Sequence, residues 1–251
     1  MEKLSVFIIT KNEADRIARC IQSVKALADE IIVVDSGSTD GTQDIAASLG
    51  AYVIFNKWPG YSLQKKFGEQ RCHHKWVLNL DADEFLSEEA VPLIRGALET
   101  PHHAAFNLCL QTLYPLEKKI HPLAKTEKLA RLYDKTKAGY SDSPVHDRII
   151  IHQGTLGTLK AIIKHEGMRN LTHWVLKNDL YASELAKNAF QKGKKASTLK
   201  LLSAYPAGFL KAFLLRRLCV YGINGVIYAH LFAHFRFMKF AKLKELYTKE
   251  Q

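Results

Sequence analysis

The sequence predicts an α/β protein with a mostly parallel sheet flanked by helices and a helical C-terminal extension. Through the first hundred residues, short apolar runs alternate with segments of helical periodicity. These runs are apolar on both faces, which is typical of parallel strands covered by helices on either side. The last third of the chain has only helical patterns. An apolar content of 47% with 24% charged residues is that of a globular protein.

Six runs have the composition of strands. The first four alternate with helices, and the last two lie in the middle of the chain, where Pro115 and Pro122 mark the loop between them. Parallel strands end at the same edge of a sheet, and ligands of such sheets bind at that edge. The expected strands are residues 4–10, 30–36, 51–55, 76–80, 104–112 and 128–134.

Four helices are expected to follow the first four strands. Asn12, Asp40 and Ser87 stand where helix N-caps belong, and residues 61–73 have helical composition.

The charge divides the chain in two. Residues 1–168 contain 21 Lys and Arg against 21 Asp and Glu, whereas residues 169–251 contain 15 against 4. The net charge of +11 therefore lies in the second part. We expect a sheet domain over 1–168 and a basic helical region over 169–251 that packs on it. Such a basic region prefers anionic lipid or nucleic acid.

The aromatic residues of the basic region favour lipid. They lie in apolar helical runs and not between basic residues on a strand face, so no nucleic-acid partner is expected. Residues 218–235 carry no formal charge, but two glycines, Asn224 and two histidines argue against a membrane span. Two interpretations stay open: a helix at the surface of an anionic bilayer, or an ordinary helix packed on the core.

The cysteines and the first residues indicate a compartment. The four cysteines form no CxxC pair, which argues against a zinc site and fits a reducing environment. The first apolar run is too short for a signal sequence. We expect a cytoplasmic protein that is peripheral on the inner face of the cytoplasmic membrane.

Acidic residues gather at the end of the fourth strand. Asp81 and Asp83 should point the same way because Ala82 between them faces the other side. Two carboxylates at an open strand end suit a hard divalent cation that in turn holds phosphate oxygens. The alternative is a set of solvated loop acids or an acidic helix start. No G-x-G-x-x-G follows the first strand and no P-loop is present, so the dinucleotide-binding and P-loop classes are excluded.

An ordered set of blocks resembles glycosyltransferase family 2, which has the GT-A fold, and is similar to its lipopolysaccharide core β-1,4-glucosyltransferase group. This resemblance implies a GT-A catalytic domain over residues 1–168. The blocks are KNEADRIARCIQSV (11–24), DEIIVVDSGSTDGT (29–42), WPGYSLQKKFG (58–68), WVLNLDADE (76–84), VHD (145–147), IIKHE (162–166), KNDLYASELA (177–186) and YPAGFLKAFLLRRLCVYGINGVIYA (205–229).

The resemblance implies a nucleotide-sugar pocket and a metal. Asp83, together with Asp81, would ligate Mg²⁺ or Mn²⁺, which neutralises charge on the departing UDP. Asp35 could instead be a turn-forming residue, and Lys65 could lie on a solvated helix face. The residues expected to bind the nucleotide sugar are Thr10, Asn12, Glu13, Asp35, Ser36, Gly37, Gln64, Lys65 and Asp81.

The resemblance also implies a catalytic base. The family pattern ends in Val-His-Glu, and this chain has Asp147 at the position of the Glu. We expect Asp147 to take the acceptor proton, with Asp142 as the reserve and Glu84 as a weaker alternative.

The expected function is that of an inverting transferase, which moves a hexose, glucose first of all, from a UDP-sugar to a glycolipid such as the lipopolysaccharide inner core. Two alternatives remain: sugar transfer to polyprenyl phosphate or another glycan, and a non-catalytic lipid-surface module on a transferase fold.

Overall fold

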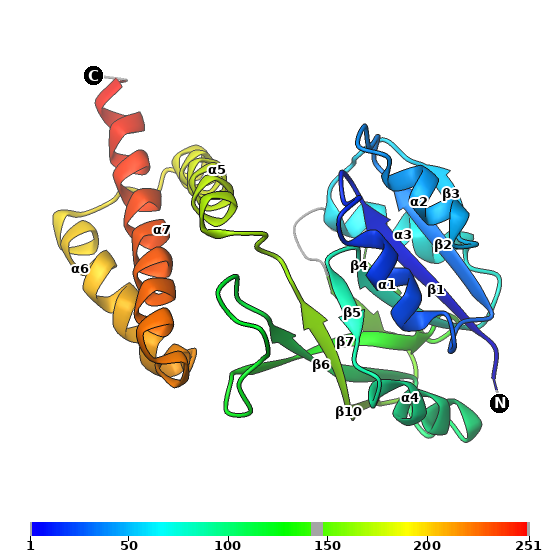
Figure 1. Cartoon of the computed structure of the whole chain (residues 1–251). Helices are drawn as coiled ribbons and strands as arrows, with labels where there is room; N and C mark the ends of the chain where they lie inside the picture. Colours follow the sequence, from blue (N-terminus) through cyan, green and yellow to red (C-terminus); the bar gives the residue numbers. More distant parts are fainter. Residues whose placement is uncertain (1, 142–147, 250–251) are drawn as a thin grey trace. The chain divides into compact units, whose positions relative to one another are not determined.

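The computed structural model describes residues 2–141 and 148–249 and divides into two compact units (Figure 1). The first unit comprises Met1–Thr112 and Thr126–Gly167, and the second comprises Leu113–Lys125 and Met168–Gln251. The sequence analysis placed residues 113–125 in the sheet domain. The structure groups this loop with the C-terminal helices instead.

The first unit is built on an eight-stranded sheet with the order β3-β2-β1-β4-β7-β6-β10-β5. Neighbours are parallel from β3 to β4 and between β6 and β10, and the other three pairs are antiparallel. The prediction of a mostly parallel sheet is confirmed. The strands are β1 (Leu4–Thr10), β2 (Glu30–Asp35), β3 (Tyr52–Phe55), β4 (Trp76–Asp81), β5 (Glu84–Leu86), β6 (Ala105–Thr112), β7 (Thr126–Asp134) and β10 (Leu156–His165), and β8 (Ala138–Tyr140) pairs with β9 (Ile149–Ile151) in a second small sheet.

Four helices belong to the first unit: α1 (Ile17–Val24), α2 (Thr42–Ser48), α3 (Tyr61–Arg71) and α4 (Ala90–Glu99). Two cap predictions were wrong. Asn12 accepts a hydrogen bond from the backbone of Thr39 (2.9 Å), and α1 begins only at Ile17. Ser87 Oγ has no hydrogen-bond partner among the described residues, and α4 begins only at Ala90, with Glu89 at the N-cap position. Asp40 accepts a hydrogen bond from the first residue of α2 (3.1 Å).

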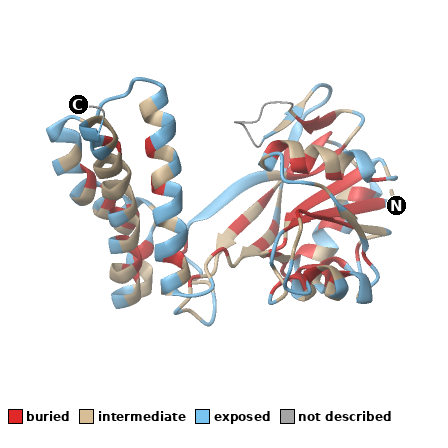
Figure 2. Ribbon diagram, turned by 90° about the horizontal axis from the view of Figure 1, so that it is seen from above, coloured by how far each residue is buried: buried red, intermediate tan, exposed pale blue. Residues whose placement is uncertain are grey.

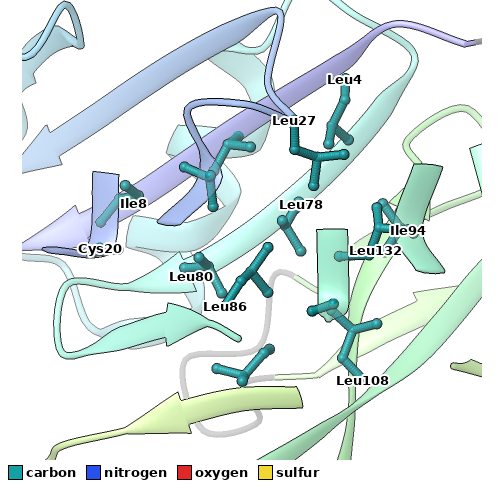
Figure 3. Packing of buried hydrophobic residues seen from close by; sticks show 14 of the residues in the cluster. Leu4, Ile8, Cys20, Leu27, Leu78, Leu80, Leu86, Ile94, Leu108 and Leu132 are labelled. Atoms are coloured by element: carbon teal, nitrogen blue, oxygen red, sulfur yellow. The ribbon is translucent and has the colours of Figure 1, made fainter. Parts of the chain in front are cut away.

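Apolar residues cover both faces of the sheet, as the strand composition predicts. Successive side chains of β1 alternate between two clusters: Val6 and Ile8 join one, and Phe7 and Ile9 join the other. Figure 3 shows the first cluster, in which Ile8, Leu78 and Leu80 of the strands lie with Cys20 of α1. This packing on both faces fixes the strand register and therefore fixes where the strand ends lie.

The second unit is helical. It contains α5 (Leu171–Gln191), α6 (Thr198–Leu210), a π-helical turn η1 (Lys211–Leu215), a short 3₁₀ turn η2 (Leu218–Tyr221) and α7 (Gly222–Lys249). Helix α7 packs against both α5 and α6 (Figure 1). In the described chain, the segment Leu218–Lys249 is the one helical stretch whose length and apolar composition would suffice to cross a membrane.

An aromatic cluster ties the loop 113–125 to these helices. Tyr114 stacks on Tyr228 with ring centroids 4.7 Å apart and on Trp174 at 5.7 Å. Glu117 accepts hydrogen bonds from Asn224 and from the Tyr228 hydroxyl, each of 3.1 Å. Asn224 therefore anchors the loop within the second unit.

Candidate active site

The sheet register brings three predicted polar strand ends together. Thr10 at the end of β1 pairs with Asp35 at the end of β2, and its neighbour Ile9 pairs with Asp81 at the end of β4. The three polar residues are therefore adjacent at one edge of the parallel strands, as the sequence predicts. Thr10 Oγ1 is buried and has no hydrogen-bond partner among the described residues. Such an orphaned hydroxyl is a group that a ligand could satisfy.

Asp35 organises the loop after β2. Its Oδ1 accepts hydrogen bonds from the backbone of Gly37 and of Ser38 and from Gln43 Nε2, each of 2.8 Å. Its Oδ2 accepts from the Ser38 hydroxyl, and the residue is fully buried. Gly37 adopts a φ of +91°, which favours glycine. In this structure the turn-forming interpretation of Asp35 holds, and its carboxylate shapes the loop around Gly37.

The loop after β1 is fastened to the loop after β2. The backbone N–H of Asn12 donates to Ser38 Oγ (2.8 Å), and that of Glu13 donates to Thr42 Oγ1 (2.8 Å). Asn12 itself adopts a φ of +55°, a conformation that asparagine tolerates better than most residues. The two expected nucleotide-binding loops therefore form one connected rim.

Helix α3 contributes polar side chains to the buried side of this rim. Gln64 is fully buried, donates to Ser36 Oγ (3.0 Å) and accepts from Asn56 Nδ2 (2.7 Å). Lys65 is only 2% exposed, so the interpretation as a solvated helix face was wrong. Its Nζ lies 3.1 Å from Asp81 Oδ1.

Asp81 lies between two cations. Besides Lys65, it faces Arg131, whose NH2 is 3.5 Å from Asp81 Oδ2. Burial raises the pKa of Asp81, but the positive charges of Lys65 and Arg131 outweigh burial and hold the pKa below its usual value. Asp81 is therefore a carboxylate at neutral pH. Its oxygens face protein cations, so its expected part in metal ligation stays a prediction.

Glu84 is turned toward the interior. It is 2% exposed, and its Oε1 lies 2.6 Å from Arg131 NH2, while Arg131 NH1 donates to Asn79 Oδ1 (2.7 Å). Tyr140 also donates to Asn79 Oδ1 (2.8 Å). Burial raises the pKa of Glu84, and the charge of Arg131 opposes that rise. This closed network makes Glu84 a support for Asp81 and a poor acceptor of a substrate proton.

Asp83 lies beside a histidine that the sequence analysis did not single out. His165 Nε2 is 3.4 Å from Asp83 Oδ2, and Arg16 NH1 is 4.0 Å from the same oxygen. The side chains of Asp83 and His165 are 15% and 29% exposed. Burial lowers the pKa of His165, but a hydrogen bond to Asp83 and the charges of the nearby carboxylates raise it above its usual value. The carboxylates of Asp83, Glu84 and Asp81 therefore outweigh burial in setting the pKa of His165.

Pairing between β10 and β5 explains how His165 reaches the site. His165 is opposite Glu84 in that antiparallel pair. A Cβ added to Gly167 would lie 2.6 Å from His165 Nε2, so the glycine lets the chain pass close to the imidazole. The signal in the sequence was the histidine before the last residue of the IIKHE block.

The Asp83 and His165 side chains fit a divalent cation. They offer one oxygen and one nitrogen donor close together, and Mn²⁺ accepts both types while Mg²⁺ prefers oxygen. The described residues contain no group of three or more His, Cys, Asp or Glu side chains arranged for a metal. Two protein donors suffice where substrate phosphates and waters complete the coordination sphere.

The expected base and its reserve, Asp147 and Asp142, lie outside the described residues. Both stay predictions.

Comparison with known proteins gives the family. The family model described as Glycosyl transferase family 2 matches residues 5–155. An uncharacterized glycosyltransferase of Rickettsia prowazekii is 40% identical over 262 residues, which span 100% of this chain and 90% of the relative. The lipopolysaccharide core biosynthesis glycosyltransferase LpsC of Rhizobium meliloti is 29% identical over 250 residues, which span 96% of this chain and 91% of that protein.

Among solved structures, glucosyl-3-phosphoglycerate synthase from Mycobacterium tuberculosis with Mn²⁺ and UDP-glucose is 26% identical, with a TM-score of 0.39 over 44% of each chain. The family match covers more than half of the chain and the relative from Rickettsia covers all of it. The protein described here belongs to glycosyltransferase family 2.

Proposed function

We propose that the protein is an inverting hexosyltransferase that moves a sugar, glucose first of all, from UDP to a cell-envelope glycolipid such as the lipopolysaccharide inner core. The observation that carries this proposal is the paired arrangement at the strand ends: Asp81 with Lys65 and Arg131, and Asp83 with His165. Cations and carboxylates alternate there over a short distance, which suits a diphosphate and its counter-ion.

Each group of the site has a role in this proposal. Asp83 and His165 would hold Mg²⁺ or Mn²⁺, with Asp81 as the further predicted ligand. When bound, the cation would supply Lewis-acid stabilisation of the charge on the leaving diphosphate. Lys65 and Arg131 fix the orientation of Asp81, because each of them lies within 3.5 Å of one of its oxygens.

The rim formed by the loops after β1 and β2 binds the nucleotide. Thr10 offers the unsatisfied hydroxyl, and backbone groups around Gly37 can approach the base or ribose closely. The remaining members of the expected set support this rim: Asn12, Glu13, Asp35, Ser36 and Gln64.

Asp147 accepts the proton of the acceptor hydroxyl in this proposal. The hydroxyl oxygen forms its bond to the anomeric carbon as the bond to the UDP oxygen breaks. Attack from the face opposite the leaving group inverts the configuration at that carbon. The acceptor class is supported by the relative from Rhizobium meliloti, whose name assigns it to lipopolysaccharide core biosynthesis. A glycolipid acceptor would place the protein on the inner face of the cytoplasmic membrane.

The test is a panel of nucleotide sugars with the purified full chain, scored by nucleotide release with extracted lipopolysaccharide or with polyprenyl phosphate. UDP-glucose with the lipopolysaccharide acceptor should give the highest rate, and chelation of divalent cations should remove it. Asp147→Asn should abolish transfer while UDP binding persists. If only polyprenyl phosphate supports turnover, it replaces the glycolipid as the proposed acceptor. If the protein shows neither hydrolysis of UDP-sugars nor metal-dependent UDP binding, the non-catalytic module is favoured.

A further inference from the structure

Helix α6 packs on α7 through small side chains. Ala204, Gly208 and Ala212 are the buried residues of α6 and of the turn that follows it. A Cβ added to Gly208 would lie 3.1 Å from the Cα of Ala233 in α7, so the two helices approach closely there. Beside these small residues, Phe209 and Phe213 are partly buried and pack against the aromatic cluster of the second unit.

The outward side of the same segment carries large apolar side chains. Leu199 is 76% exposed, Leu202 is 70% and Leu215 is 71%, and Leu210 and Leu214 are more than half exposed. These five leucines of α6 and η1 are called the leucine face below. A helix on the surface of a water-soluble domain normally turns its large apolar residues inward. In Figure 2, the helices of the second unit carry many residues in the pale blue of exposed positions. Large apolar side chains that gather exposed on one helical segment are typical of an interaction site.

In the sequence, the charged residues that directly precede and follow the leucine face are all positive. Residues 185–244 contain twelve Lys and Arg and no Asp or Glu. Lys194 and Lys195 precede α6, and Arg216 and Arg217 follow η1. Leucines on one surface with lysines and arginines at its borders are the pattern of a helix that lies in a membrane interface. The basic residues would meet the negative surface potential of an anionic leaflet.

The same charges argue against a second copy of the chain as the occupant. A two-fold interface centred on the leucine face would bring Lys194, Lys195, Arg216 and Arg217 of both copies together, and like charges repel. A lipid surface has no such conflict, since its headgroups supply the opposite charge.

We propose that the leucine face of α6 and η1 docks on an anionic phospholipid bilayer, with its leucines among the upper acyl chains and the flanking Lys and Arg at the headgroups. This inference adds a contact surface to the membrane association named in the proposed function. It rests on the proposed function only for the identity of the membrane. It also assigns the contact to α6 and η1, whereas the sequence analysis considered residues 218–235.

The experiment is flotation of the purified full chain with vesicles of phosphatidylcholine alone or mixed with phosphatidylglycerol. The wild-type chain should float with the mixed vesicles and much less with phosphatidylcholine, and added salt should weaken binding. The double variant Leu199→Gln/Leu202→Gln should lower the partition coefficient about tenfold or more, since both leucines would otherwise leave water.

Leu176→Gln/Leu180→Gln is the matched control. These α5 leucines are 62% and 68% exposed, but Asp179 and Glu184 lie on the same helix. The control should change the partition coefficient by less than about twofold. All four positions are exposed, so circular dichroism should show the same fold in each variant.

Three results would overturn the inference: no flotation of the wild-type chain, equal flotation of the two double variants, or a dimer in light scattering that dissociates only in Leu199→Gln/Leu202→Gln. The experiment uses no nucleotide sugar. A chain that floats but transfers nothing therefore contradicts the proposed function alone.

Discussion

Helices α3 and α6 break the usual pattern of an amphipathic helix in opposite ways. The buried residues of α3 are Ser62, Gln64, Lys65 and Gly68, whereas those of α6 are small and three of its four leucines are exposed. A buried lysine is costly unless a charge pairs with it, and an exposed leucine face is costly unless something covers it. In the two proposals made above, the polar burial in α3 belongs to the sugar-transfer site, and the apolar exposure in α6 belongs to the membrane contact.

The largest expected effect tests the candidate active site, which is the first of the two regions compared. Asp83→Asn should lower sugar transfer about 10²- to 10³-fold, because it removes the negative charge beside His165 that the cation would need. UDP release should be measured together with UDP affinity at increasing Mn²⁺. Asp44→Asn, at an exposed position of α2, is the control and should transfer at the wild-type rate. An Asp83→Asn variant with full turnover would remove Asp83 from the metal site.

The second prediction concerns the buried network behind Asp81. Arg131→Met should lower the free energy of unfolding by about 3 kcal/mol, since it leaves the carboxylate of Glu84 buried without its partner. Chemical denaturation would measure this loss. Arg131→Met/Glu84→Gln should recover part of the stability, because the unpaired charge is gone. A double variant that is less stable than the single one would show that Glu84 is not the source of the penalty.

The smallest effect tests the packing of α6. Gly208→Val should lower the free energy of unfolding by about 1 to 3 kcal/mol, because the new side chain would press on Ala233 of α7. Ala207→Val is the matched control at an exposed neighbour and should change stability by less than about 0.5 kcal/mol. Equal unfolding midpoints for the two variants would mean that α6 does not approach α7 closely at Gly208. The small residues of α6 would then not be explained by helix packing.

The first half of the sheet could be predicted well from the sequence. Strands that are buried on both faces have a strong local signal, and β1 begins and ends at the expected residues. Because the strands are parallel, the polar residues after them had to meet at one edge. The positions of Thr10, Asp35 and Asp81 could therefore be predicted from local composition.

The missed features depend on contacts between distant parts of the chain. His165 reaches the site only through the pairing of β10 with β5, and β10 contains an irregularity between Thr158 and Ile162 that blurs its alternation. Asn12 resembles a helix cap, but its side chain is taken by Thr39 of the next loop. No local sequence pattern predicts the pairing of β10 with β5 or the bond between Asn12 and Thr39.

The loop 113–125 limits how chimeras of this protein can be made when the C-terminal helices are replaced. The chain passes between the two units three times, at 112/113, at 125/126 and at 167/168. Cutting after Gly167 would leave Tyr114 without Trp174 and Tyr228, and Glu117 without Asn224. A chimera that takes its C-terminal helices from a relative would therefore also need the loop that corresponds to 113–125 from the same relative, because the loop and the helices pack against each other.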